Sequence, residues 1–149
     1  MKIKAKQIMC GNPQCCTPDQ TVREAAQMMV ECDCGAIPVV EQDGGHRVVG
    51  IITDRDIACR CIAQGNGPNC KVRDFMTPSV AAVGEDSSVA ECCETMERAK
   101  VRRLLVLDNQ GELCGIISQA DIALHLSKDL VAEVLKEVSE PADETLVPR

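Results

Sequence analysis

The 149-residue chain is 45% hydrophobic and 26% charged, which is ordinary for a globular protein. Its net charge of −7 argues against binding to a nucleic-acid backbone, and its single aromatic residue, Phe75, leaves no aromatic platform for stacking bases. No apolar run approaches the roughly 20 residues that span a bilayer, and no apolar segment follows the basic N-terminus, so we expect a cytoplasmic protein without a signal peptide or membrane partner.

One sequence pattern occurs twice along the chain. Residues 50–58 return as residues 115–123, and Met9 returns as Met76. The offset between the copies shrinks by two residues along the pattern, and this deletion falls in the turn around 44–46. A long repeat that is present only twice indicates two pseudo-symmetric units of helices and strands rather than a solenoid.

Each copy predicts a lead-in helix followed by the order β-α-β-β-α. The first helix of this order is amphipathic, because apolar residues recur at i, i+3, i+4 and i+7. In the first copy the lead-in ends near Met9, and the predicted elements are a strand at 14–17, a helix from Val22, strands at 36–40 and 48–52, and a helix at 54–63. In the second copy the lead-in ends near Met76, and the predicted elements are a strand at 80–83, a helix from Val89, strands at 104–107 and 113–117, and a helix at 119–126.

The amphipathic helices carry matching start signals. Thr21 and Ser88 are the predicted N-caps, since a glutamate follows each of them three residues later.

These elements predict the organisation of the whole chain. The ranges are repeat one at 4–63, a linker at 64–70, repeat two at 71–128, a C-terminal amphipathic helix at 129–140 and a disordered acidic tail at 141–149. The last four residues, 146–149, resemble the remnant of a thrombin-cleavable tag and are left out of functional reasoning.

The chain has eleven cysteines, which suggests a disulfide or zinc protein at first sight. No pair has the C-x-x-C spacing of common zinc sites, and the sequence has only two histidines. Nine cysteines correspond to an aliphatic residue in the other copy, so we expect most of them to be small buried hydrophobes. Cys10 and Cys70 are the expected exposed thiols. A disulfide or metal stays open where Cys32 and Cys34 approach other cysteines.

The motif that carries chemistry lies where a strand turns into the last helix of each copy. Thr53 precedes Asp56 by three residues, and Ser118 precedes Asp121 in the same way. This spacing is that of a capping box, in which the hydroxyl satisfies a backbone N–H of the first turn. The free N–H groups of a helix start also suit a phosphate, and a carboxylate there can accept hydrogen bonds from ribose hydroxyls. One motif can serve both purposes.

The repeated β-α-β-β-α order, together with the pattern Gly-x-x-[Thr/Ser]-x-x-Asp in both copies, resembles the CBS domain. The resemblance extends from about residue 4 to about residue 128. The chain is similar to small free-standing bacterial two-CBS proteins, some of which are tied to hypoxia or stress responses. The resemblance implies an α/β (α+β) fold in which two pseudo-symmetric repeats pack through their sheets into a Bateman module. It also implies a homodimer.

The resemblance assigns roles to the motif residues. It implies that Asp56 and Asp121 hold ribose, and that Thr53 and Ser118 help to hold phosphate. In this family, a basic residue at the start of the strand that follows the amphipathic helix reaches across to the phosphates bound at the other repeat's site. Arg102 and Arg103 stand at that position in repeat two, and Gly35 and Ala36 in repeat one.

The two copies therefore predict different ligand preferences. Arg102, Arg103 and the neighbouring Arg55 favour a phosphorylated adenosine at the Asp56 site, unless the two strand-start arginines are merely solvated. An uncharged or cationic adenosyl ligand fits the Asp121 site better. Adenine needs an apolar slot, for which Thr17, Ile37 and Pro38 are the candidates by position.

The predicted function is that of a regulatory sensor that binds AMP, ADP, ATP or S-adenosylmethionine and acts on an unknown separate protein. No cofactor is required, and no metal ligands are assigned. The alternative is a thiol- or metal-responsive stress module, a zinc or redox sensor, on the same scaffold. The sequence shows no nucleophile–base constellation and no Walker-type phosphate loop, so we do not expect an enzyme.

Overall fold

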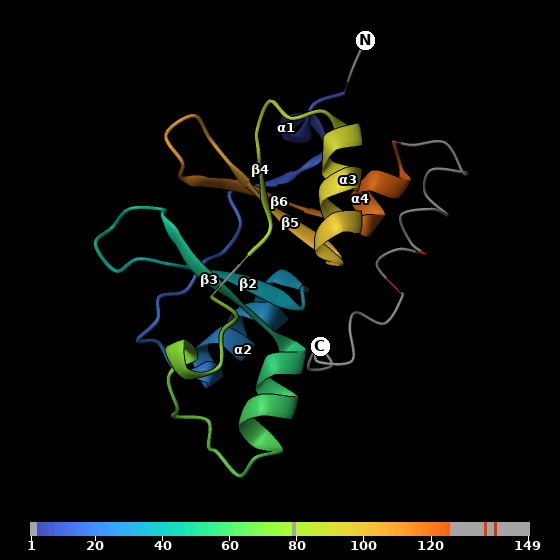
Figure 1. Cartoon of the computed structure of the whole chain (residues 1–149). Helices are drawn as coiled ribbons and strands as arrows, with labels where there is room; N and C mark the ends of the chain where they lie inside the picture. Colours follow the sequence, from blue (N-terminus) through green and yellow to red (C-terminus); the bar gives the residue numbers. More distant parts are fainter. Residues whose placement is uncertain (1–2, 79, 126–135, 137–138, 140–149) are drawn as a thin grey trace. The chain divides into compact units, whose positions relative to one another are not determined.

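The computed structural model describes residues 3–78, 80–125, 136 and 139 (Figure 1). The predicted C-terminal helix at 129–140 and the tail at 141–149 lie outside the described residues, apart from two isolated positions. The chain divides into two compact units. We call residues 13–80 the first-repeat unit, and the described residues of 1–12 and 81–148 the second-repeat unit. Both mix helices and strands, which confirms the predicted fold class.

The first-repeat unit is built on the antiparallel pair β2 (Ala36–Val40) and β3 (Val48–Thr53). Cys16 forms a single parallel bridge with Val39, so the predicted strand at 14–17 is reduced to one bridged residue. The helix α2 (Val22–Cys32) and the π-helical segment η1 (Asp56–Ile62) complete the repeat. Their buried side chains form one core with both strands: Cys16, Val22, Ala25, Met29, Ile37, Val39, Ile52, Cys61, Val72 and Phe75.

The second-repeat unit contains a four-stranded sheet in the order β1-β6-β5-β4. Its strands are β1 (Cys10–Gly11), β4 (Ala82–Gly84), β5 (Arg103–Leu107) and β6 (Leu113–Ser118), and its helices are α1 (Ala5–Ile8), α3 (Val89–Ala99) and α4 (Gln119–Ala123). The strand pair β4–β5 is parallel, and β6 is antiparallel to both of its neighbours. All three helices contribute buried side chains to one core with the sheet, and α3 and α4 lie beside it in Figure 1.

The two repeats exchange their lead-in segments. The lead-in of repeat one, α1 and β1, lies in the second-repeat unit, where Cys10 pairs with Ile116. The lead-in of repeat two begins with the short 3-10 helix η2 (Val72–Asp74) and lies in the first-repeat unit, where Thr77 bridges Ile51. Both pairings join the same two positions of the repeat, so the exchange itself follows the internal symmetry.

The helix start signals work as the sequence predicts. The Glu24 N–H donates to Thr21 Oγ1, and the Glu91 N–H donates to Ser88 Oγ, both at 3.1 Å. These bonds confirm the two N-caps. Both helices end at a residue in the left-handed conformation, Asp33 in α2 and Lys100 in α3.

The last helices differ from the prediction in detail. The helix predicted at 54–63 becomes π-helical from Asp56, and the Ala63 N–H donates to the Ala58 carbonyl five residues back. The helix predicted at 119–126 is described as α4, which ends at Ala123. A π-helical turn widens the helix locally and is frequent at functional sites.

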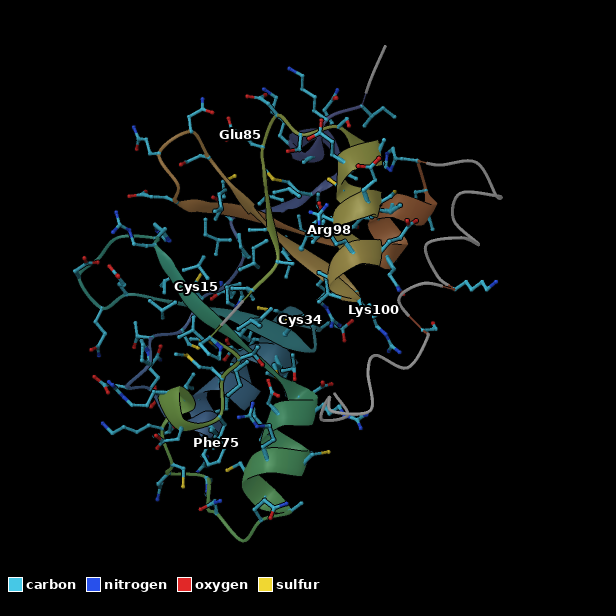
Figure 2. All side chains as sticks on the ribbon, in the orientation of Figure 1. Cys15, Cys34, Phe75, Glu85, Arg98 and Lys100 are labelled. Carbon is cyan, nitrogen blue, oxygen red and sulfur yellow. The ribbon has the colours of Figure 1, made fainter. Side chains whose placement is uncertain are left out.

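The prediction for the cysteines is right for some and wrong for others. Cys16, Cys61, Cys92 and Cys93 are buried as expected, and Cys10 is exposed as expected. Cys32, Cys34 and Cys59 are exposed, although an aliphatic residue stands at their place in the other copy; Cys34 and the half-buried Cys15 are labelled in Figure 2. Cys70, expected to be exposed, is also half-buried because it packs against the core of the first-repeat unit. All eleven thiols are free.

Among the residues that the structure describes, every helix is too short or too polar to cross a lipid bilayer.

Candidate functional site

The Thr53–Asp56 turn closes on itself through two reciprocal hydrogen bonds. Thr53 is the last residue of β3, and its backbone N–H donates to Asp56 Oδ2 at 3.0 Å. In return the Asp56 N–H donates to Thr53 Oγ1 at 3.0 Å. The capping function predicted from the spacing is therefore present, and it fixes the carboxylate at the start of η1.

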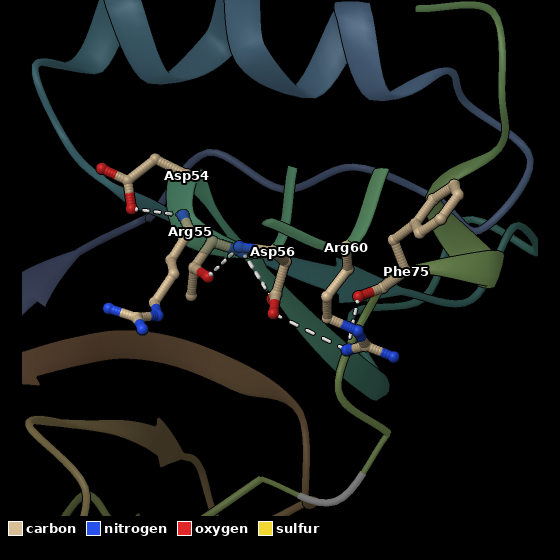
Figure 3. Close-up of polar contacts among 6 residues, drawn as sticks. Asp54, Arg55, Asp56, Arg60 and Phe75 are labelled. Carbon is tan, nitrogen blue, oxygen red and sulfur yellow. Dashed lines mark hydrogen bonds and ion pairs between the residues drawn. The ribbon is translucent and has the colours of Figure 1, made fainter. Parts of the chain in front are cut away.

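Asp56 is a buried charged residue, only 8% exposed. Its second oxygen, Oδ1, lies 3.6 Å from Arg60 Nη1, one helical turn further along η1 (Figure 3). The same Arg60 nitrogen donates to the Phe75 carbonyl at 2.9 Å. A buried carboxylate needs a partner, and Arg60 supplies a positive charge for it.

The second copy repeats this geometry with fewer partners. The Ser118 N–H and Ser118 Oγ lie 2.8 and 3.0 Å from Asp121 Oδ2, and the Asp121 N–H lies 3.3 Å from Ser118 Oγ. His125 stands at the position that corresponds to Arg60, but its ring contacts the Asp121 carbonyl and not the carboxylate. Nearby, the buried amide nitrogen of Gln119 has no hydrogen-bond partner among the described residues. The two sites thus share a frame and differ in charge.

This geometry can accept a diol. Each carboxylate oxygen has two lone pairs, and at Asp56 one backbone donor occupies Oδ2 while Arg60 is too distant from Oδ1 for a hydrogen bond. The carboxylate therefore keeps acceptor capacity for two adjacent hydroxyl groups. The N–H groups of Asp54, Arg55 and Asp56 at this helix start already donate to Gly35, Asp54 and Thr53, so positive charge for an anion beside the diol has to come from side chains such as Arg55.

The residues predicted to form an adenine slot lie in the same unit as Asp56. Ile37 pairs with Ile52 in the two-stranded sheet, and it is only 1% exposed because its side chain belongs to the core. Pro38 is also among the fully buried residues. Thr17 is half-buried in the turn after Cys16, where its N–H donates to Gln20 Oε1. A role of these residues in binding a base stays a prediction.

The predicted phosphate-binding arginines fall into both units. Arg55 is exposed beside Asp56, and its N–H donates to Asp54 Oδ1 at 2.8 Å. Arg102 and Arg103 are exposed at the start of β5 in the second-repeat unit. The Arg102 carbonyl accepts the Gln119 N–H. Their action on a ligand at Asp56 stays a prediction.

Arg60 is the member of the site that the sequence reasoning missed. The signal was present, because Arg60 follows Asp56 by four residues and such pairs share one helix face. Its second partner is a backbone carbonyl 15 residues away, which no local pattern reveals.

An open groove of about 840 Å³ lies next to this site in the first-repeat unit. Its walls are mostly apolar and come from α2, η1 and the residues beside them, and they include two acidic residues and a thiol: Ala26, Met29, Val30, Asp33, Cys34, Gly35, Asp54, Ile57, Ala58 and Ile62. Val30 is 82% exposed and Ile62 53% exposed, so two large apolar side chains of this groove face solvent.

Potential metal ligands stay apart within the described residues of one chain. Across the part of the chain that the structure describes, no three side chains of His, Cys, Asp or Glu gather closely enough to hold a metal ion.

The comparisons with known proteins point in one direction. The model of the CBS domain matches residues 5–61 and 72–128, which is most of the chain and both repeats. The uncharacterized protein YlbB of Bacillus subtilis is 38% identical over 138 residues, which cover 92% of each protein. Hypoxic response protein 1 of Mycobacterium tuberculosis is 34% identical over 92% of this chain and 94% of that protein.

Two solved structures are informative neighbours. The crystal structure of Hypoxic Response Protein I with two coordinated zinc ions has a TM-score of 0.74 and 34% identity, over 84% of this chain and all of that one. The CBS domain pair of protein MJ0100, in complex with 5-methylthioadenosine and S-adenosyl-L-methionine, has a TM-score of 0.73 and 25% identity, over 83% of this chain and 95% of that one.

Proposed function

The chain belongs to the CBS-domain family, and on this basis we propose that it is a regulatory module that binds an adenosyl ligand at the strand-to-helix turns of its two repeats. Free-standing pairs of CBS domains are regulatory rather than catalytic. The ligands we propose are AMP, ADP, ATP or S-adenosylmethionine, and the regulated partner is a separate protein.

The observation that carries this proposal is the state of the two carboxylates. Each carboxylate accepts the backbone N–H of the residue three positions earlier, whose hydroxyl accepts the aspartate N–H, so the orientation of both carboxylates is set before a ligand arrives. A preorganised acceptor binds a ribose diol without the cost of ordering its own side chain. The ligands of the MJ0100 neighbour are adenosyl compounds, which supports the same chemical class here.

The first site is the proposed place for a phosphorylated ligand. Arg55 is exposed one residue before Asp56, and we propose that Arg102 and Arg103 also contribute positive charge to a ligand held there. At the corresponding place beside Asp121, Ala120 adds no charge. A ligand without phosphate groups, such as S-adenosylmethionine, is proposed for that second site.

A test of the ligand class is the change in thermal stability on adding each nucleotide. A ligand that binds only the folded protein stabilises it by about 2.7 kcal/mol at a concentration of 100 times its Kd. We expect AMP, ADP or ATP to raise the Tm, and GMP to raise it less. Arg102→Gln with Arg103→Gln should reduce the rise for the phosphorylated ligands and leave that for S-adenosylmethionine. A Tm that no adenosyl compound moves would reject the proposal.

A thiol or metal module is the second candidate function, and one observation favours it. The neighbouring Hypoxic Response Protein I carries zinc at 34% identity, and Cys10, Cys32, Cys34 and Cys59 are exposed in this chain. The described residues of one chain do not fit a zinc site. Metal analysis of the native protein separates the candidates, because stoichiometric zinc would favour this second one.

A further inference from the structure

We propose that Arg60 is a positioning residue that couples the carboxylate of Asp56 to the lead-in segment of repeat two, residues 72–77. This inference rests on the proposed function, since the coupling regulates the same site. It concerns one guanidinium nitrogen, which lies between the Asp56 carboxylate and the backbone of Phe75 (Figure 3).

The two contacts of Arg60 differ in kind. Its Nη1 donates to the Phe75 carbonyl at 2.9 Å, which is an ordinary hydrogen bond. The same nitrogen is 3.6 Å from Asp56 Oδ1, which is a charge contact without a hydrogen bond. Arg60 therefore balances the buried charge of Asp56 and leaves the lone pairs of Oδ1 for ligand hydroxyls.

The segment that Arg60 contacts is tightly held on both sides of Phe75. The Met76 N–H donates to the Val72 carbonyl at 2.9 Å, which closes the turn of η2. Thr77 exchanges two backbone hydrogen bonds with Ile51, at 2.8 and 3.0 Å. The chain leaves the first-repeat unit after Val80. Phe75 therefore lies on the segment by which the chain leads out of the first-repeat unit.

The coupling belongs to the first site. Ligand hydroxyls that donate hydrogen bonds to Oδ1 weaken its attraction for the Arg60 guanidinium, which is then free to shift against the Phe75 carbonyl. In repeat two the corresponding residue, His125, follows α4, and its ring contacts the Asp121 carbonyl and not the Asp121 carboxylate.

The chain offers a single reporter for this link, because Phe75 is its one phenylalanine and no tyrosine or tryptophan is present. Protein labelled with 4-fluorophenylalanine gives one ¹⁹F resonance, from a ring that is 9% exposed in the core. Without ligand, we expect Asp56→Asn to shift this resonance in the wild-type background and not in the Arg60→Gln background. Arg47→Gln, which removes an exposed arginine of the same unit, is the matched control and should leave the Asp56→Asn shift intact.

The second arm adds AMP. In the wild type the ¹⁹F resonance should move as AMP is added, and half of its shift should occur at the AMP concentration that calorimetry gives as the midpoint of binding. Arg60→Gln should weaken AMP binding by roughly tenfold, because the buried Asp56 carboxylate loses its charged partner, and its resonance at saturation should move less. Arg60→Lys keeps the charge and should restore most of the affinity.

The two ideas fail in different ways. An Asp56→Asn shift that is absent in the wild type, or equal in both backgrounds, overturns the coupling even if AMP binds. If AMP and the other adenosyl compounds do not bind at all, the proposed function fails, and the ligand-free comparison still decides whether Arg60 links Asp56 to Phe75.

Discussion

At the scale of single residues, Asp56 and Asp121 show how one local motif gives two different sites. In both copies the hydroxyl accepts the backbone N–H of the aspartate, and the carboxylate in return accepts the backbone N–H of the residue three positions earlier, so the motif closes a helix cap. Asp56 is buried and faces Arg60, whereas Asp121 is only half-buried and has no cationic neighbour within 4 Å among the described residues. The difference favours tighter binding, and a more anionic ligand, at the first site.

Buried thiols give the protein a measurable weakness at high pH. Burial raises the pKa of Cys16 to about 12, and that of Cys92 and Cys93 to about 11, from a usual value of 9.0. These raised pKa values contribute their full stabilisation below pH 9, where the thiols are protonated in the unfolded chain as well. This contribution is lost as the pH rises from 9 through the pKa values of the folded protein. We expect the free energy of unfolding, measured in urea, to fall by roughly 4 kcal/mol between pH 8 and pH 10 from these three groups.

The control for this pH dependence comes from the repeat. Cys92 and Cys93 correspond to Ala25 and Ala26 in α2, so the double variant Cys92→Ala and Cys93→Ala places in α3 the residues that its counterpart already has. In this variant the free energy of unfolding should fall by only about one third as much between pH 8 and pH 10 as in the wild type. An unchanged decrease would show that other groups cause it.

The cysteines also show where comparison of the two copies is misleading. The aliphatic residues that correspond to Cys32 and Cys59 are Ala99 and Leu124, and both of these are themselves exposed. An aliphatic residue is compatible with the surface, so it does not predict burial at its counterpart. The buried Cys92 and Cys93 were predicted correctly, because they also follow the helical periodicity of α3.

At the scale of elements, the exchanged lead-in segments explain the glycine of the repeated motif. A Cβ at Gly50 would lie 2.7 Å from the Thr77 carbonyl oxygen and 2.9 Å from Met76 Sδ. At Gly115 it would collide with Met9, the counterpart of Met76. The glycine is therefore needed for the close approach of the lead-in segment, and not for an unusual backbone conformation.

Gly50→Ala should accordingly destabilise the protein. The new methyl group meets a backbone atom that is hydrogen-bonded to Ile51, so the lead-in has to move, and we expect a loss of about 1–3 kcal/mol in the free energy of unfolding. Gly67→Ala, in the same unit with open space around it, should change the stability by less than about 0.5 kcal/mol. Equal effects of the two substitutions in urea unfolding would contradict the explanation.

Most elements could be predicted from the sequence, but not their partners. The apolar periodicity predicted α2 and α3, and short apolar runs around a glycine turn predicted β2 and β3 within one residue at each end. The exchange of the lead-ins was not predicted, because a periodic pattern gives the element and its buried face but not the repeat against which it packs. For the same reason the motif predicted Thr53 and Asp56, and the contact of Arg60 with the lead-in stayed hidden.

At the scale of the whole molecule, we propose a homodimer that uses the apolar groove of the first-repeat unit. Val30 and Ile62 are exposed on this groove, and burial of such side chains against a second copy would remove them from water. Val30→Asp should shift the protein toward the monomer in light scattering, with little change in the stability of the monomer because Val30 is 82% exposed. Gln27→Asp, a substitution of another exposed residue of α2, is the control. A dimer that is unaffected by Val30→Asp would place the contact elsewhere.

The central claim is that Asp56 holds an adenosyl ligand, and calorimetric titration of AMP into the reduced protein tests it most directly. We predict saturable binding in the wild type, loss of at least roughly tenfold in affinity in Asp56→Asn, and a smaller loss in Asp121→Asn. Asparagine keeps the shape of the side chain and an acceptor for the Thr53 N–H, so a folding defect does not explain the loss. Binding that is equal in the wild type and Asp56→Asn, or absent in both, would contradict the account and leave Thr53 and Asp56 as a helix cap alone.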